Sequence, residues 1–301
     1  MGQQPTVYLI DASIYIFRAW FSVPDSMRGG DGQPINAVYG FARFLTEFAE
    51  RSKAQHVAVA FDESLTTSFR NEMYPQYKMN RELPPPELKN QFELCRRLAE
   101  AAGFFCVSHS GYEADDLIAT LCGRMRAEGF RAGIVSGDKD LTQLLVERDF
   151  WWDFARNQQL DAAGVEVKFG VPPSAIQDYL GLCGDAVDNI PGVPGVGPKT
   201  AVALLAEYGS VENIYRNLDQ IHQLAVRGAK TLKAKLVEHQ AQALLSKELA
   251  TVCYTAPIES SVDDLRRHSA EVTTLNEISQ LLGGRGEGLF QRLAQSAHAL
   301  A

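Results

Sequence analysis

The stretch Val7-Tyr8-Leu9-Ile10-Asp11 is a short apolar run that stops at an acidic residue, and it decides the fold. Two runs of the same kind follow, residues 57–61 before Asp62 and residues 132–135 shortly before Asp138. Short apolar and β-branched runs are typical of buried strands in a parallel sheet. Because ligands of open α/β sheets bind outside the carboxyl ends of the strands, the sequence predicts an acidic pocket at one sheet edge.

Further acidic residues are expected at the same pocket: Glu113, Asp115, Asp116, Asp140, Asp185 and Asp188. So many carboxylates repel one another unless cations lie among them. Oxygen-only ligands favour hard ions such as Mg²⁺ or Mn²⁺, and phosphodiester hydrolysis is the chemistry that most needs a pair of them. Each acid alone is better explained as a helix N-cap or turn residue. Their shared position at one sheet edge makes a metal site the better interpretation of the group.

The bulk composition is that of a soluble globular protein. The 301 residues are 46% hydrophobic and 22% charged, enough for one large domain or two. No apolar stretch is long enough for a membrane span, and no secretory signal is recognised. Five cysteines without a CxxC pair argue against zinc and disulfides and predict a cytoplasmic location. The net charge of −8 alone argues against a polyanionic ligand, although metal ions bound among the acids would cancel part of it.

Strand and helix signals alternate in the first half of the chain. Strands are also expected at 104–107 and 150–154, and helices at 37–51, 88–102, 115–127 and 141–145. This alternation predicts an α/β fold with a mostly parallel sheet over residues 1–170. From Val171 onward we expect a helical domain, residues 171–301, with helices at 174–182, 199–208, 211–217 and 231–252 and a helical tail after Ser260.

Residues 192–200 form a glycine-rich segment between two predicted helices. It is not a nucleotide-binding P-loop, because Pro198 intrudes between Gly197 and Lys199 and a helix precedes the segment. Glycine lets backbone amides approach a phosphate, and the helix N-terminus adds positive potential. Such a hairpin is suited to gripping a duplex backbone without contacting bases. The alternative is a plain interhelical turn.

Basic residues cluster twice along the chain. The first cluster is Arg70, Lys78, Arg81 and Lys89, and the second is Arg227, Lys230, Lys233 and Lys235. Tyr74 and Tyr77 interleave with the first cluster, a mixture that suits single-stranded nucleic acid, although a solvated loop would look similar.

These motifs together resemble the 5′ nuclease family of flap endonucleases and 5′→3′ exonucleases, particularly the N-terminal nuclease domain of bacterial DNA polymerase I. The matching segments are Leu9-Ile10-Asp11, residues 37–41, Phe61-Asp62, Phe69-Arg70 with Tyr77-Lys78, and residues 111–116, 137–141 and 184–201. The resemblance implies a PIN-like 5′ nuclease fold with a helical arch at about 63–88. It also implies a helix-three-turn-helix element in the second domain, with its hairpin at 192–201. Since no polymerase domain follows, a free-standing nuclease is expected.

Residue roles are carried over from the family by position. The implied metal ligands are Asp11, Asp62, Glu113, Asp115, Asp116, Asp138, Asp140, Asp185 and Asp188. Lys78 and Arg81 would contact the scissile phosphate, and Tyr77 would stack on a base. Further DNA contacts are expected from Arg70, Gly195, Gly197, Lys199, Thr200, Lys233 and Lys235. Two positions depart from the family pattern, with Ala12 replacing a usual glycine and Val187 a frequent serine.

The resemblance implies a structure-specific 5′ nuclease that hydrolyses DNA by two-metal-ion catalysis. It implies two or more Mg²⁺ ions, with Mn²⁺ as a substitute, and a K⁺ ion at the hairpin turn. The expected partner is branched or flapped DNA with a 5′ end, bound by a monomer away from any membrane. Two alternatives stay open: a catalytically weak protein that binds branched DNA, and an RNA-directed nuclease of the related PIN class. The helix–hairpin–helix segment argues against the second.

Overall fold

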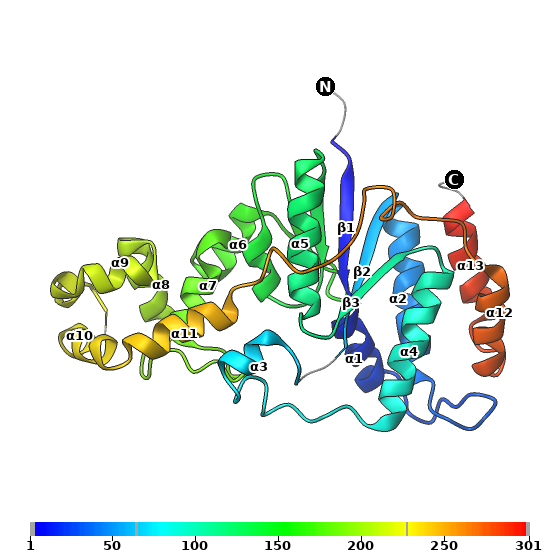
Figure 1. Ribbon diagram of the computed structural model, residues 1–301, viewed down its shortest axis with the longest axis horizontal. Coiled ribbons are helices and arrows are strands. Elements are labelled where there is room, and N and C mark those ends of the chain that lie inside the picture. Colours follow the sequence, from blue (N-terminus) through cyan, green and yellow to red (C-terminus); the bar gives the residue numbers. More distant parts are fainter. Residues whose placement is uncertain (1–3, 64–65, 227, 299–301) are drawn as a thin grey trace.

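A six-stranded sheet forms the centre of the computed structural model, which describes residues 4–63, 66–226 and 228–298 (Figure 1). Arg227 of the second basic cluster and residues 64–65 of the predicted arch lie outside these ranges. The strand order is β3-β2-β1-β4-β5-β6, and every pair is parallel except β5 with β6. The strands are β1 (Thr6–Asp11), β2 (His56–Asp62), β3 (Phe105–His109), β4 (Arg131–Val135), β5 (Phe150–Asp153) and β6 (Gln158–Leu160).

The strand register brings the predicted acidic residues to one edge. Ile10 lies opposite Val135 of β4, and Asp11 lies opposite Ala60 of β2. The carboxyl ends of the central strands therefore meet, as the parallel arrangement requires. The predicted parallel α/β sheet is confirmed, and β6, too short and polar to give a strand signal, is an addition.

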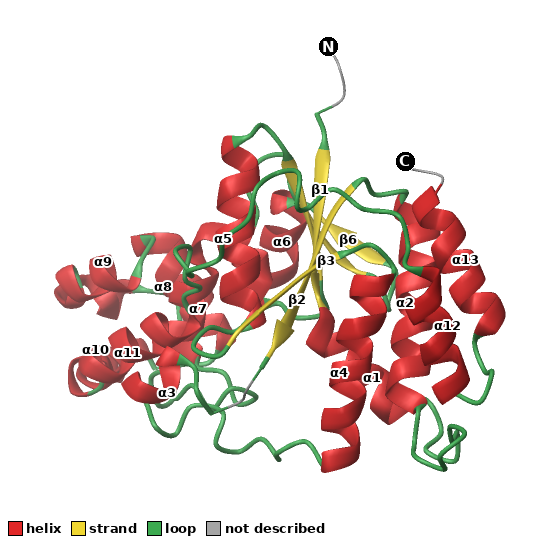
Figure 2. Cartoon of the chain, turned by 45° about the vertical axis from the view of Figure 1, so that its right-hand side comes forward, coloured by secondary structure: helices red, strands yellow, loops and turns green. Residues whose placement is uncertain are grey.

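The two faces of the sheet bury alternate residues of the same strands. Along β1, Leu9 belongs to one hydrophobic cluster and Ile10 to the other, as the two-residue period of a strand dictates. One face is covered by α5 (Ala114–Ala127). The other is covered by α1 (Ala12–Ser22), α2 (Asn36–Ser52) and α4 (Pro86–Ala101) (Figure 2). Both clusters are hydrophobic cores, and together they hold in place the strands whose ends carry the acids.

The second half is helical, as predicted, but its boundaries differ. Its helices are α6 (Ala162–Phe169), α7 (Ile176–Cys183), α8 (Pro198–Tyr208), α9 (Val211–Arg216), α10 (Ala229–Glu238) and α11 (Gln240–Ala250). The single helix expected at 231–252 is wrong, because the chain leaves helical geometry at His239 with φ −110° and ψ 23°. The helix expected at 141–145 is instead a 3₁₀ helix, η1 (Asp140–Leu144). Neither α1 nor α6 was anticipated.

The first basic and aromatic cluster lies on a segment with little regular structure. A five-residue helix, α3 (Phe69–Met73), is followed by turns up to the start of α4. In the described part of residues 63–88, α3 and the first turn of α4 are the helical pieces, so the arch is mainly turns rather than helix.

The tail is helical, as expected, but it does not pack against the helical domain to which it was assigned. Helices α12 (Val272–Leu281) and α13 (Glu287–His298) lie against α4 and α2 of the α/β part. Their apolar residues Leu275, Ile278, Phe290 and Leu293 join the cluster on that face. The chain therefore returns to its starting domain after α11, and α7 to α11 form the helical lobe at the left of Figure 1. Within the described ranges, no helix combines the length and apolar character of a membrane span.

Gly103 is expected to report on the packing of the returning chain. Its φ is +83°, and a Cβ atom there would lie 2.1 Å from the carbonyl oxygen of His268. Gly103→Ala should therefore lower the free energy of unfolding by about 1–2 kcal/mol for the left-handed conformation and roughly 1–3 kcal/mol for the collision. Gly129→Ala is the control, because Gly129 has φ +87° but nothing within 4 Å. Equal losses in urea unfolding would contradict the close packing at His268.

Candidate functional site

Four carboxylates from four different elements meet at the carboxyl edge of the sheet. Asp11 ends β1, Asp62 ends β2, Asp115 lies in the first turn of α5, and Asp138 follows β4. Burial, together with the negative charges of Asp62 and Asp138, raises the pKa of Asp11 to about 7. Burial and the charges of Asp138 and Asp11 likewise raise the pKa of Asp115. Among the described residues, none of the four forms an ion pair.

Local hydrogen bonds fix the carboxylate of Asp11 and the backbone of Asp138. One Asp11 oxygen accepts the Ile14 N–H at 3.4 Å as the N-cap of α1, and the other accepts the Ser136 hydroxyl at 2.9 Å. The Ser136 oxygen in turn accepts the Asp138 N–H at 3.0 Å. The Trp151 indole donates to the Asp138 carbonyl at 2.9 Å. The N-cap explanation of Asp11 is therefore correct, and it coexists with a place in the acidic group.

A second set of acids lies beside the first and is neutralised by basic side chains. Lys78 Nζ lies 2.8 Å from Glu113 Oε1 and 3.7 Å from Asp188 Oδ2. Arg81 forms an ion pair with Asp188. Burial would raise the pKa of Glu113, but the charges of Lys78 and Arg70 hold it below its ordinary value. The site is thus divided into an uncompensated group and a compensated group of carboxylates.

Lys139 pairs with acids from both halves of the molecule. It forms an ion pair with Asp185 of the helical part, and its Nζ lies 3.3 Å from Asp140 Oδ1. Burial and the charge of Asp138 nevertheless raise the pKa of Asp140 to about 8. Burial opposes ionisation of Asp185, but the hydrogen bond and charge of Lys139 keep its pKa below the ordinary value. Asp140 therefore belongs with the crowded carboxylates, and Asp185 with the compensated ones.

The uncompensated group suits a divalent cation. It consists of carboxylate oxygens, the ligands that hard ions prefer, and the raised pKa values of Asp11, Asp115 and Asp138 reflect repulsion and desolvation that a cation would relieve. In the described part of the chain no three acidic, histidine or cysteine side chains already converge as closely as metal ligands do. Asp11, Asp62, Asp115 and Asp138 are the residues that could hold such an ion.

The structure places Asp116 and Arg70 in a buried ion pair with each other. Asp116 is fully buried and accepts two hydrogen bonds from Arg70, at 2.7 and 2.8 Å, and one from the Cys253 N–H at 2.7 Å. Arg70 is 2% exposed and also donates to the carbonyls of Leu249 and Thr251. A carboxylate and a guanidinium so engaged are available neither to a metal ion nor to a phosphate. They join α3, α5 and the end of α11 instead.

Tyr77 is also placed differently from its prediction as a base-stacking residue. Its ring is 3% exposed, and its hydroxyl donates to Glu113 Oε2 at 3.0 Å. Sequence cannot distinguish an aromatic residue that faces substrate from one that packs under a loop. Here the ring supports the turn that carries Lys78.

Two turns face each other across the compensated group, residues 76–81 and residues 185–190. The Lys78 N–H donates to the Asp188 carbonyl at 3.0 Å, and the Asn189 side chain donates to the Gln76 carbonyl at 2.6 Å. Lys78 and Asn189 both have φ of 55°, a left-handed conformation that costs free energy for residues other than glycine. The paired turns hold the Lys78 ammonium group among the acids.

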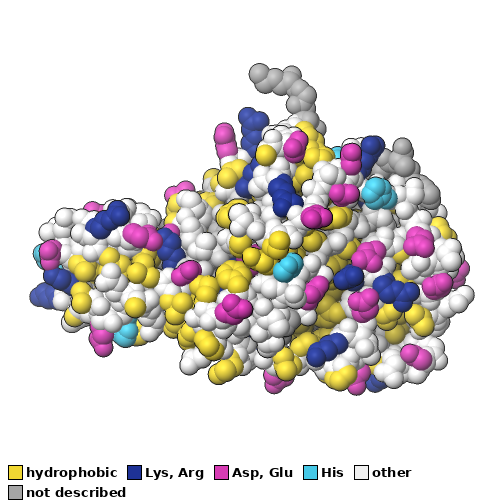
Figure 3. All heavy atoms as spheres, viewed as in Figure 1, with side chains coloured by type: hydrophobic (Ala, Val, Ile, Leu, Met, Phe, Trp, Pro, Cys, Tyr) yellow, Lys and Arg dark blue, Asp and Glu magenta, His cyan; other side chains and the backbone are white. Residues whose placement is uncertain are grey.

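The hairpin predicted to contact DNA is formed between α7 and α8. Gly195 has φ +79°, and the Lys235 ammonium group lies over it, 2.5 Å from where a Cβ atom would be. Gly197 precedes α8 with open space around it. Lys199 and Thr200 lie in the first turn of α8, whereas Lys233 is paired with Asp219 at 2.5 Å. In Figure 3, basic and acidic side chains are interspersed on this lobe.

Sequence reasoning missed Lys139 and Ser136. Lys139 lies between Asp138 and Asp140, and a basic residue between two predicted ligands could have indicated that it pairs with an acid of the site. Ser136 joins β4 to Asp138, and its role depends on a contact with β1 that no local pattern reveals.

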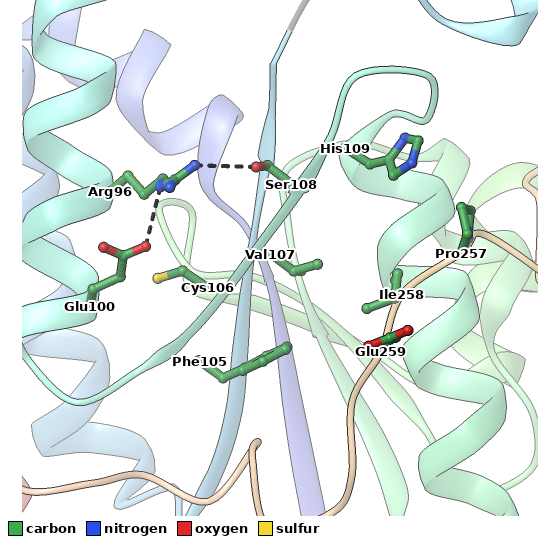
Figure 4. Close-up of a pocket in the computed structure, with 10 residues that line it drawn as sticks. All are labelled: Arg96, Glu100, Phe105, Cys106, Val107, Ser108, His109, Pro257, Ile258 and Glu259. Carbon is green, nitrogen blue, oxygen red and sulfur yellow. Dashed lines mark hydrogen bonds and ion pairs between the residues drawn. The ribbon is translucent and has the colours of Figure 1, made fainter.

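Two cavities border this part of the molecule. One of about 540 Å³ opens beside Asp62 and is lined by Phe17, Phe92, Leu83 and Lys89. The other, of about 340 Å³, lies along β3 between α4 and residues 257–259 (Figure 4). The second contains none of the predicted site residues.

Asp138→Asn should stabilise the protein in EDTA at high pH. Raised carboxyl pKa values mean that the folded state binds protons more tightly than the unfolded state, so stability falls as pH rises from about 4 to 8. Removing one charge reduces that fall. We expect the variant to gain about 2 °C or more in Tm over the parent at pH 8, and less at pH 5. The exposed Asp263→Asn is the control, and a parent Tm that does not fall over this range would contradict the crowding.

Two family models match the chain in succession. The 5′-3′ exonuclease N-terminal resolvase-like domain matches residues 6–170, and the 5′-3′ exonuclease C-terminal SAM fold matches residues 171–273. DNA polymerase I of Bacillus caldotenax is 42% identical over 262 residues, which are 85% of this chain and 29% of that protein. The chain thus spans less than a third of such polymerase relatives. A 5′-3′ exonuclease of Aquifex aeolicus is 36% identical over 277 residues, 92% of each chain.

Solved structures share the fold at low sequence identity. The zinc-bound T5 5′-exonuclease has a TM-score of 0.66 and 19% identity, covering 98% of this chain and 99% of that one. The catalytic core of Rad2 in complex with DNA substrate has a TM-score of 0.64 and 16% identity, covering 97% and 93%. The predicted fold class is confirmed. With its matched domains and full-length relative, the chain belongs to the 5′-3′ exonuclease family.

Proposed function

We propose that this protein is a structure-specific 5′ nuclease, a 5′→3′ exonuclease and flap endonuclease that hydrolyses phosphodiester bonds of DNA. The observation that carries the proposal is the uncompensated group of Asp11, Asp62, Asp115 and Asp138 at the sheet edge, beside the cationic Lys78. Membership of the exonuclease family supports the same reaction type. The expected products carry a 5′ phosphate and a 3′ hydroxyl.

The uncompensated group is proposed to hold two or more Mg²⁺ ions, with Mn²⁺ able to replace them. Bound there, such ions lower the pKa of an attacking water and stabilise the leaving oxygen. Four further acids lie next to this group and add to the negative potential that attracts cations: Asp140 and the compensated Glu113, Asp185 and Asp188. That the T5 5′-exonuclease binds divalent metal ions supports this assignment.

Lys78 and Arg81 are proposed to orient the scissile phosphate. Both side chains extend from the turn at 76–81 into the acidic site, where Glu113 and Asp188 hold them. A phosphate entering the site offers competing oxygens to the same donors. A cation fixed in advance beside the reacting group acts mainly on charge in the transition state. The cavity beside Asp62, with its Phe17 and Phe92 rings and Lys89, offers room for an unpaired 5′ strand.

Duplex DNA is proposed to bind at the hairpin between α7 and α8. Gly195, Gly197 and the first turn of α8 present backbone amides, and Lys235 adds a positive charge at Gly195. Such contacts hold phosphates irrespective of base sequence. The catalytic core of Rad2 is known in complex with DNA substrate, which supports a DNA ligand here. A K⁺ ion at the hairpin, flapped DNA as the preferred substrate, and action as a monomer stay predictions.

Cleavage of a 5′-flap DNA with and without Mg²⁺ tests the function. The parent should cut near the branch only with the ion, and Lys78→Ala should slow single-turnover cleavage roughly 100-fold with little change in binding measured in Ca²⁺. Lys168→Ala, on the exposed face of α6, is the matched control. Binding of the flap without any Mg²⁺-dependent cut would instead support a branched-DNA-binding protein. Cleavage of RNA in preference to DNA would support the RNA-directed class.

Gly197→Glu should weaken duplex binding roughly tenfold, because it places a negative charge at a helix N-terminus that faces phosphate. A Cβ atom at Gly197 meets nothing within 4 Å, so the fold should be unaffected. Gly288→Glu adds the same charge on α13, also in open space, and serves as the control. Fluorescence anisotropy across a salt series in Ca²⁺ measures both. Unchanged binding by Gly197→Glu would make the hairpin a purely structural turn.

A further inference from the structure

Each of the two facing turns exposes one large apolar side chain at its tip. Met79 is 71% exposed on the turn at 76–81, and Val187 is 65% exposed on the turn at 185–190. By contrast, Tyr77, two residues before Met79, and Asp188, directly after Val187, are buried. Neither Met79 nor Val187 has a role in the nuclease reaction proposed above, and neither belongs to the hydrophobic cores.

Hydrogen bonds hold the two tips together and leave their side chains free. The Asn80 side chain donates to the Ala186 carbonyl at 2.8 Å, and Arg81 Nε donates to the Val187 carbonyl at 3.5 Å. The Val187 N–H is bound by Asp185 Oδ1 at 2.7 Å. The backbone polar groups of Val187 are thus already satisfied within the protein. What the tip offers to a ligand is its apolar side chain.

Both apolar residues border the acidic site. Met79 follows Lys78 in the chain, Val187 precedes Asp188, and the Lys78 and Asp188 side chains approach to 3.7 Å. Met79 and Val187 therefore lie on the two sides of one charged contact at the rim of the site. Single exposed apolar residues are ordinary on a surface. These two, however, lie on turns that hydrogen bonds hold together beside charged groups.

We propose that Met79 and Val187 form an apolar contact for a nucleobase of the DNA strand, next to the phosphate held in the acidic site. The proposal rests on the nuclease function proposed above. Every base has an apolar face, so the contact tolerates any sequence, and the thioether of methionine adapts to surfaces of different shape. The contact forms on binding, and it should affect KM more than kcat.

A mutant–substrate cycle tests the contact. The parent, Met79→Ala and Val187→Ser act on a 5′-flap DNA and on two versions that are abasic at the nucleotide on either side of the cleaved bond. Met79→Ala should raise KM on intact DNA about fivefold through loss of buried apolar area, with kcat little changed. On one of the two abasic substrates, the KM of the parent should already be raised to this extent, and the substitutions should cause no further increase in KM. Met79→Leu should behave like the parent.

Val167→Ala, an 88%-exposed valine on α6, is the control for removing a surface apolar group and should change nothing. Equal losses by the variants on intact and on both abasic substrates would overturn the base contact, as would variants that match the parent on intact DNA. A parent without Mg²⁺-dependent cleavage would overturn the nuclease function itself, and this inference with it. Tm values for each variant separate folding defects from lost contact.

Discussion

Crowding of buried carboxylates at one sheet edge is the constraint on which the rest of this structure depends. Asp11, Asp62, Asp115 and Asp138 come together at the edge where the parallel strands end, and the raised pKa values of Asp11, Asp115 and Asp138 show the cost of bringing them there. Three features stabilise this arrangement: the two hydrophobic cores, the hydrogen bond from Ser136 to Asp11, and the N-cap of α1. Repulsion that a folded chain has to hold in place is also what gives such a site its affinity for cations.

Basic side chains divide the acids into two groups with different tasks. Lys78 and Arg81 come from the segment between β2 and α4, whereas Lys139 comes from the loop after β4, and their partners Asp185 and Asp188 lie on the helical part. The compensated acids therefore hold the basic side chains in place, and their ion pairs join two parts of the molecule. The uncompensated acids have no ion-pair partner among the described residues. Arg70 and Asp116 show the limit of assigning roles by position, since both are consumed by a buried ion pair that supports the site from beneath.

The elements with a strong periodic pattern could be predicted from sequence, and so could the position of the acids. Their apolar runs alone predicted the strands at residues 7–11, 57–62 and 132–135, and the parallel arrangement then placed the acids at one edge. The break at His239 could not be predicted, because neither glycine nor proline marks it. The burial of Tyr77 and the pairing of Arg70 depend on contacts across more than 30 residues, which local patterns do not encode. The same holds for the tail, whose amphipathic helices were clear but whose partners, α2 and α4, lie at the other end of the chain.

The return of the chain to the α/β part makes the helical lobe an inserted segment rather than an appended one. It leaves the sheet after β6 and comes back through residues 251–271, which bond to Gln55 and Gly103 at the opposite end of the strands. Arg70 fastens the point of return through the carbonyls of Leu249 and Thr251. The helical segment is held by more than these two connections, because Val193, Leu232 and Leu249 belong to the same hydrophobic cluster as Leu9 of β1. Together with the ion pair of Lys139 and Asp185, this shared core fixes the position of the hairpin between α7 and α8 relative to the acids, so the two move as one body.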